Sequence, residues 1–188
     1  MSKKLEYLVW HCTATPEGRW VDGEDIIKWH TSKPPAGRGW KQVGYSKLIL
    51  LDGTIHSFVN EDEDDIVDNW EITNGVAGIN SISRHYCYAG GLDKDTFEPK
   101  DTRTPEQLKT MKELTLKFIA RYKDAEVKGH YHFAAKACPC FNVEEWLKEI
   151  TKPELDYTEE AIIKEPVEIP RETKPIHFFE WLSKIFKR

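Results

Sequence analysis

Near its N-terminus the chain carries the stretch Leu5-Glu6-Tyr7-Leu8-Val9-Trp10-His11-Cys12-Thr13-Ala14-Thr15. Apolar and aromatic side chains alternate in its first part, and this period of two predicts a strand from Leu5 to Trp10. The small polar residues from His11 to Thr15 are expected to end the strand. His11 therefore stands just beyond a strand, where a rigid sheet can hold a side chain in a site.

Patterns typical of helices and of strands follow one another over the rest of residues 1–150. Helical spacing predicts helices over residues 24–30, 104–122 and 143–150. The second of these begins with Thr104 as a capping residue and Gln107 completing a capping box. Strand patterns predict a hairpin, 45–51 and 54–59 around a two-residue Asp52-Gly53 turn, and shorter strands at 86–89 and around Val127. We expect these elements to form one α/β domain.

The composition changes at Thr151. Residues 151–174 are rich in glutamate and contain three prolines, which predicts a linker. Residues 175–188 place aromatic and aliphatic side chains on one helical face and charged ones on the other, which predicts a C-terminal amphipathic helix. Such a helix can make peripheral contact with a membrane, pack back on the domain or pair with another copy. The oligomeric state stays open.

Composition and charge exclude several classes of protein. The chain has 188 residues, with 27 Lys and Arg against 32 Asp and Glu, a net charge of −5. The charges are mixed along the sequence without a basic stripe, so we expect no nucleic-acid partner. No apolar run is long enough to cross a bilayer or to form a signal peptide. Four cysteines are too few for a disulfide-dense miniprotein, which favours free thiols or metal ligands.

Three potential metal ligands stand at or beyond the ends of predicted strands: His11, His130 and Cys138. Two imidazoles and one thiolate suit Zn²⁺, and three protein ligands leave the fourth tetrahedral position open for water, as in a catalytic zinc site. Taken singly, each of these residues is more often structural. Spacing alone therefore leaves a zinc site and ordinary packing roles both open.

Three segments of the chain together resemble a known family. They are Val9-Trp10-His11-Cys12-Thr13-Ala14-Thr15, Gly39-Trp40…Val43-Gly44-Tyr45 and Gly129-His130…Lys136-Ala137-Cys138-Pro139, in this order. They resemble the zinc-dependent N-acetylmuramoyl-L-alanine amidases, the family that includes phage amidase-type lysozymes and the peptidoglycan recognition proteins. The resemblance covers about residues 5–150 and says nothing about residues 151–188. It implies a central mixed β-sheet flanked by helices, with zinc in a groove at one edge.

The resemblance assigns roles position by position. It implies three zinc ligands: His11, His130 and Cys138. His132 is the rival for the second place, and His130 is preferred because its eight-residue separation from Cys138 matches the family. Tyr45 matches a tyrosine whose hydroxyl lies near the attacking water, and Lys136 matches a lysine that faces the reaction intermediate.

The activity implied is hydrolysis of the amide between N-acetylmuramic acid and L-alanine in the stem peptide of peptidoglycan. Because no signal peptide is expected, the favoured context is a phage-type endolysin, made in the cytoplasm and released to the cell wall by a holin or by lysis. The alternatives are a non-catalytic peptidoglycan-binding module, a cytoplasmic muropeptide-recycling amidase, or a zinc hydrolase acting on another amide. The presence of Tyr45, Lys136 and Cys138 favours an enzyme.

The sequence departs from the family in two places. Ser46-Lys47 stands where the family usually has His-Phe, and Arg84-His85-Tyr86 stands where it has an apolar residue, glycine and an apolar residue. Polar bulk in a central strand leaves the sheet register there open, and His85 is either structural or a groove contact. We expect packing or surface roles for His30 and most other histidines. We expect core positions for most of four tryptophans: Trp20, Trp29, Trp40 and Trp70.

Overall fold

The computed structural model describes residues 2–152, and the predicted linker beyond residue 152 and the predicted helix at 175–188 lie outside the described residues. Five strands form the main sheet in the order β5-β4-β7-β2-β9. Their bounds are Tyr7–Cys12 for β2, Lys47–Ile49 for β4, Ile55–Ser57 for β5, Ser83–Tyr88 for β7 and Glu126–Gly129 for β9. Strands β4, β7, β2 and β9 run parallel, and β5 is antiparallel to β4. The sheet is therefore mixed, as predicted.

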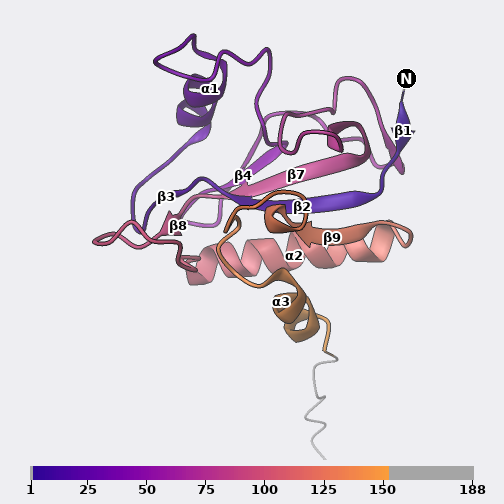
Figure 1. Ribbon diagram of the computed structural model, residues 1–188. Coiled ribbons are helices and arrows are strands. Elements are labelled where there is room, and N and C mark those ends of the chain that lie inside the picture. Colours follow the sequence, from indigo (N-terminus) through magenta and orange to yellow (C-terminus); the bar gives the residue numbers. More distant parts are fainter. Residues whose placement is uncertain (1, 153–188) are drawn as a thin grey trace, which may run out of the picture. The chain divides into compact units, whose positions relative to one another are not determined.

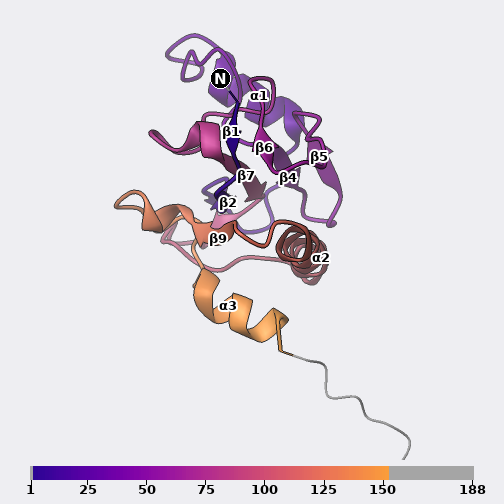
Figure 2. The ribbon, with the colours of Figure 1, turned by 90° about the vertical axis from the view of Figure 1, so that its right-hand side faces the viewer.

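Helices cover both faces of this sheet, which gives three layers (Figure 1). Helix α1, Gly23–Thr31, lies over one face, and α2, Pro105–Arg121, and α3, Val143–Ile150, lie on the opposite side. The view turned by 90° shows the same order of layers (Figure 2). This arrangement confirms the predicted α/β fold class. None of the helices in residues 2–152 is both long and apolar enough to cross a membrane.

Shorter elements complete the described part of the chain. Two small sheets pair β1, Lys3–Lys4, with β6, Ile66–Val67, and β3, Thr15–Pro16, with β8, Gly91–Leu92. Two single 3₁₀ turns precede β7 and follow β9: η1, Asn80–Ile82, and η2, His130–His132. The second turn places a histidine directly after the edge strand β9.

Strand β2 begins and ends two residues later than the sequence predicted. Its pairing with β7 explains the difference, because the parallel ladder continues through His11 opposite Cys87 and Cys12 opposite Tyr88. Polar and small residues were expected to end the strand, but the neighbouring strand keeps their backbone extended. His11 is therefore held within the ladder and not in a loop beyond it.

The face toward α2 and α3 carries the larger apolar core. Trp10 of β2 is fully buried there, with ring centroids 5.6 Å from Tyr86 and 6.1 Å from Trp146, both in edge-to-face geometry. Its indole Nε1 donates to the Thr115 hydroxyl of α2 at 3.1 Å. Aromatic pairs of this kind stabilise a core beyond the area that they bury. The tryptophan thus joins the sheet to both helices.

Helix α2 confirms the predicted capping box. The Thr104 hydroxyl accepts from Gln107 N, and Gln107 Oε1 accepts from Thr104 N, each at 3.0 Å. The same Gln107 is fully buried, and its Nε2 donates to the carbonyls of Ile49 at 3.1 Å and Ala89 at 3.0 Å. A buried polar side chain is tolerated when its hydrogen bonds are made, and here these bonds join the helix to the ends of β4 and β7.

The hairpin between β4 and β5 is confirmed, but its turn differs from the predicted two-residue Asp-Gly turn. Gly53 N donates to Leu50 O, and Leu50 N donates to Thr54 O. The turn is therefore centred on residues 51–52, and Gly53 follows with a φ of 80°. Glycine suits this left-handed position, and a Cβ there would lie 2.8 Å from the Glu106 carbonyl oxygen.

The departure at Arg84 does not disturb the sheet. Arg84 is buried, and its guanidinium lies 3.2 Å from a Glu71 carboxylate oxygen and donates to the Tyr122 hydroxyl at 2.6 Å. Glu71 is also buried and accepts from the backbone N–H groups of Asp62 and Asp68. Because the two charges are paired and further hydrogen-bonded, β7 keeps a regular register with β2 through all six of its residues.

Candidate functional site

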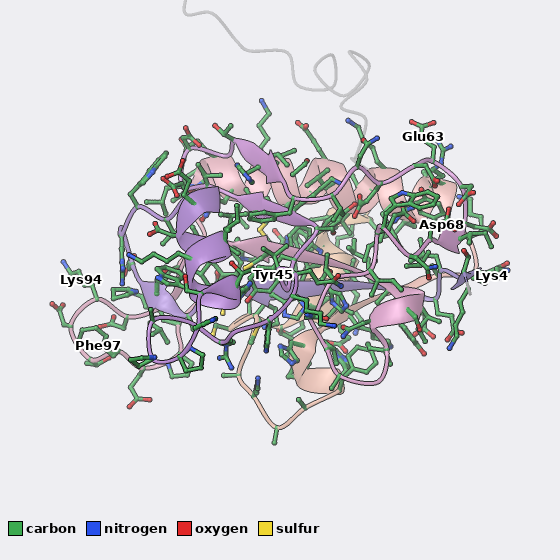
Figure 3. The ribbon with its side chains drawn as sticks, turned by 90° about the horizontal axis from the view of Figure 1, so that it is seen from above. Lys4, Tyr45, Glu63, Asp68, Lys94 and Phe97 are labelled. Atoms are coloured by element: carbon green, nitrogen blue, oxygen red, sulfur yellow. The ribbon has the colours of Figure 1, made fainter. Side chains whose placement is uncertain are left out.

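A cleft of about 470 Å³ opens on the sheet face that α1 partly covers. Figure 3 looks onto this face and shows Tyr45 near its middle, with Lys94 and Phe97 at one end and Lys4 and Asp68 at the other. The polar and aromatic residues that line the cleft include His11, His30, Arg38, Trp40, Tyr45, Asn74, Asn80, His130 and Lys136. Two of the predicted ligands and both predicted catalytic residues therefore share one cavity.

Three donor atoms converge beside this cleft from three segments of the chain. His11 comes from β2, His130 opens η2 directly after β9, and Cys138 follows in the next loop. The two histidine Nδ1 atoms are 3.1 Å apart, Cys138 Sγ is 3.8 Å from His11 Nδ1, and all three donors lie within 4.8 Å of one another. Ordinary bond lengths around tetrahedral Zn²⁺ give about 3.3 Å between nitrogens and about 3.6 Å from nitrogen to sulfur. The donors could hold a metal ion of this size.

The electrostatic surroundings leave these donors free for a cation. Burial lowers the pKa of His130 to about 4, and burial together with neighbouring imidazoles holds the pKa of His11 well below its ordinary value. Both rings are thus neutral at pH 7, with a lone pair available. The Cys12 backbone N–H donates to Cys138 Sγ at 3.3 Å, a bond that stabilises a thiolate. All four cysteines are free thiols.

The rival histidine, His132, is bonded elsewhere. Its Nδ1 faces the backbone of Gly129 at 3.0 Å, and its Nε2 pairs with the Glu144 carboxylate of α3. The ring also stacks on Tyr131 with a centroid separation of 4.3 Å. The structure thus brings His130, and not His132, to the other two donors.

The two predicted catalytic residues flank the donors. The Tyr45 ring centroid lies 5.2 Å from that of His11, and burial raises the pKa of its phenol well above the ordinary value. Its hydroxyl therefore stays protonated at neutral pH. Lys136 is exposed and lines the cleft, and its positive charge contributes to the low pKa of His11 and His130. A hydroxyl group, which is hydrogen-bonded to the Cys87 thiol, and a cation thus lie beside the donor set.

Sequence reasoning missed the part that two other histidines play on this face. His30 is buried, lines the cleft, and accepts from Gly44 N at 3.0 Å. His85 is fully buried, with Nδ1 3.1 Å from His11 Nε2. Burial lowers the pKa of His30 to about 4 and that of His85 to about 3. The available signal was alternation along residues 83–88, which puts His85 on one sheet face once the register is known.

The tryptophans correct another expectation. Trp20 is 52% exposed and Trp70 is 62% exposed, so neither belongs to the core. Trp29 and Trp40 are partly buried, and Trp40 lines the cleft with the Arg38 guanidinium 5.3 Å from its ring centroid. Amphipathic rings at an open surface are common where a protein meets a ligand with both apolar and polar parts. The sequence alone did not distinguish these surface tryptophans from core residues.

Comparisons with known proteins agree with this architecture. Residues 1–141 match the model of the N-acetylmuramoyl-L-alanine amidase family. The endolysin of Escherichia phage T7 is 31% identical over 137 residues, which cover 72% of this chain and 81% of that protein.

Two solved structures share the fold. The amidase LysC from Clostridium intestinale superposes with a TM-score of 0.60 at 20% identity, covering 80% of this chain and 87% of that one. The bumblebee peptidoglycan recognition protein PGRP-SA gives a TM-score of 0.55 at 19% identity, covering 77% and 81%. These structural likenesses confirm the fold class that the sequence predicted, and the family match confirms the resemblance. The chain therefore belongs to the N-acetylmuramoyl-L-alanine amidase family.

Proposed function

We propose that this amidase is a phage-type endolysin that binds one Zn²⁺ through His11, His130 and Cys138. Its substrate is the amide between N-acetylmuramic acid and L-alanine in peptidoglycan. The observation that carries the proposal is the convergence of three donor atoms within 4.8 Å of one another. Two of them, from His11 and His130, line a cleft that also holds Tyr45 and Lys136. The family match and the similarity to phage endolysins support the same activity.

The metal and two residues of the chain, Tyr45 and Lys136, would each contribute a different part of the reaction. A bound zinc ion would supply Lewis-acid polarisation of the carbonyl and lower the pKa of a water. Tyr45, protonated because burial raises its pKa, hydrogen-bonds the attacking water, gives its own proton to the leaving amine of alanine and takes up the proton that the water loses. The Lys136 ammonium stabilises negative charge on the carbonyl oxygen, an effect worth about 10²–10³ in rate.

The remaining lining of the cleft suits an acidic, amide-rich ligand. It offers two cations, Arg38 and Lys136, and two side-chain amides, Asn74 and Asn80. Among the described residues that line it there is no carboxylate. A stem peptide carries carboxylates and amides, and its sugar presents an apolar ring face that Trp40 can meet. The lining therefore favours a muropeptide over a neutral or cationic amide.

The experiment that tests the activity uses purified peptidoglycan sacculi and defined muropeptides, with mass spectrometry of the products. We expect free L-alanine N-termini and intact lactyl groups, complete loss of turnover on chelation, and recovery with zinc. Cys138→Ala should bind sacculi without releasing product. Products cut between sugars or within the stem peptide would reject the proposed bond, and full turnover after removal of the metal would reject the zinc site.

The same preparation separates the alternatives. A binding module would sediment with sacculi but release nothing even with zinc present. A recycling amidase would cleave soluble muropeptides much faster than polymer, whereas an endolysin should solubilise intact sacculi. We place the protein in the cytoplasm until the membrane is opened, and addition to permeabilised cells should lyse them while addition to intact cells should not.

A further inference from the structure

His85 is a fully buried histidine in the centre of β7, and its ring faces His11. Its Nδ1 lies 3.1 Å from His11 Nε2, and the two ring centroids are 5.2 Å apart. The parallel register sets Val9 of β2 opposite His85, so these two side chains point to the same face of the sheet. His11 stands two residues after Val9 on β2, so its imidazole lies on that face as well. The contact therefore comes from strand pairing in the middle of the sheet and not from a mobile loop.

The direction of this hydrogen bond follows from the donor set. His11 presents Nδ1 to His130 at 3.1 Å and to Cys138 at 3.8 Å. A ring nitrogen that binds a metal cation carries no proton, so neutral His11 must carry its proton on Nε2. That Nε2–H donates to His85 Nδ1, and His85 in turn keeps its own proton on Nε2.

Backbone hydrogen bonds and packing hold His85 in this position, while its buried Nε2 has no hydrogen-bond partner among the described residues. Its backbone carbonyl accepts from Ser46 N at 2.8 Å and from the Ser46 hydroxyl at 3.0 Å. The ring lies against Gly75, where a Cβ atom would overlap the imidazole. Glycine at this position therefore leaves the space that the ring occupies, and Ser46 holds the strand from which the ring projects.

We propose that His85 is a positioning residue for the metal site, because it accepts the Nε2 proton of His11 and so fixes the ring that presents Nδ1 to the metal. The inference rests on the proposed zinc ligands and deepens that assignment. The acceptor behind a metal-bound histidine is usually a carboxylate, a carbonyl or a water. Here the neutral imidazole of His85 accepts the hydrogen bond instead, and it adds no negative charge to a site that already contains a thiolate.

The test compares two substitutions in the full chain. In His85→Asn, the amide oxygen takes the place of Nδ1 and still accepts from His11. In His85→Phe, the ring remains but the acceptor is lost. Zinc affinity is measured by competition with a chromophoric chelator. We expect His85→Phe to bind zinc about 10–100-fold more weakly than the wild type, and His85→Asn to stay within about threefold.

A second readout separates positioning from a merely structural role. Imidazole ¹⁵N spectra of the zinc-loaded wild type should show His11 bound through Nδ1 with its proton on Nε2. Thermal unfolding in chelator checks that both variants fold. If His85→Phe does not fold, Gly75→Ala displaces the same ring and should show the same loss of affinity.

Distinct outcomes overturn distinct claims. Equal zinc affinity of wild type, His85→Asn and His85→Phe would overturn the role of His85 while leaving the ligand set intact. Binding of zinc through Nε2 of His11 would do the same. A wild-type chain that takes up no zinc would instead overturn the ligand set of the proposed function, and the positioning role with it.

Discussion

On the side of the sheet toward α2 and α3, β2 contributes Trp10 to an apolar core, whereas on the other side the next residue, His11, joins a cluster of imidazoles. Successive side chains of a strand point to opposite faces. The first face carries the larger apolar core, whereas the second carries the imidazoles beside a smaller apolar cluster that includes Ile26 and Leu48. The larger apolar core and the predicted catalytic residues therefore lie on opposite faces of one sheet, so substitutions in the two places should affect stability and turnover to different extents.

On the face of the sheet that carries His11 and the cleft, here called the imidazole side, Lys136→Ala should have the largest effect on turnover. Loss of a cation that stabilises the oxyanion should lower kcat about 10²–10³-fold. The free energy of unfolding should change by less than about 0.5 kcal/mol, because Lys136 is exposed. Turnover of a defined muropeptide and a urea titration measure the two quantities. The matched control is Lys109→Ala on exposed α2 surface, and equal kcat for both variants would contradict the assignment.

Met111→Ala tests the opposite face. Met111 is fully buried in the core beneath α2, so truncation should cost about 2–5 kcal/mol of unfolding free energy. Zinc affinity and kcat per folded molecule should be unchanged. Met111→Leu conserves volume and should cost less than about 1.5 kcal/mol. A loss of kcat in folded Met111→Ala would show that the two faces are coupled.

The imidazole side should also make stability depend on pH. The pKa of His30 is about 4 in the folded chain and about 6.5 when unfolded. As pH falls, the unfolded chain takes up the His30 proton before the folded chain does. The contribution of neutral His30 to the free energy of unfolding is therefore fully present above about pH 6.5 and is lost as pH falls toward 4. We expect a loss on the order of 2–3 kcal/mol over that window.

The measurement is urea unfolding in chelator at several pH values. His30→Asn keeps an acceptor for the Gly44 N–H but does not titrate. Its unfolding free energy should therefore vary less with pH than that of the wild type. Parallel pH profiles for the two proteins would exclude His30 as the cause.

The smallest expected effect lies at the start of α2. Thr104→Ala removes the hydroxyl that accepts from Gln107 N and should cost about 1 kcal/mol of stability. Thr104→Ser keeps the hydroxyl and should cost clearly less. Thermal melts of the two variants measure the difference. No change in kcat is expected, because the cap belongs to the side of the sheet away from the cleft.

The local elements could be predicted from sequence because their signals are local. The helix at 143–150 matches its prediction, and the capping box at Thr104 marks the start of α2 within a residue. The resemblance also named the residues that the structure brings together as a donor set, although their role as ligands stays a prediction. The activity class and the family were likewise predicted and are supported by the comparisons.

What the sequence did not reveal depends on pairing between distant segments. The extension of β2 through His11 and Cys12 comes from its ladder with β7, and the contact between His85 and His11 requires the register of those two strands. The burial of Arg84 depends on Glu71, a partner from a loop that no local pattern marks. Polar residues in a strand look misplaced until their partners are known, and one sequence alone does not give those partners.

The hydrogen bonds of Gln107 limit which parts of the cleft can move when a polymer enters. Its side chain both starts α2 and bonds the carbonyls at the ends of β4 and β7. Helix and strands are thereby expected to move as one body, which gives the cleft a stiff floor. A glycan chain that enters must then be accommodated by the loops that line the cleft above that floor, which lie within residues 38–45, 74–80 and 130–136. We expect adjustment to substrate width to be confined to those loops.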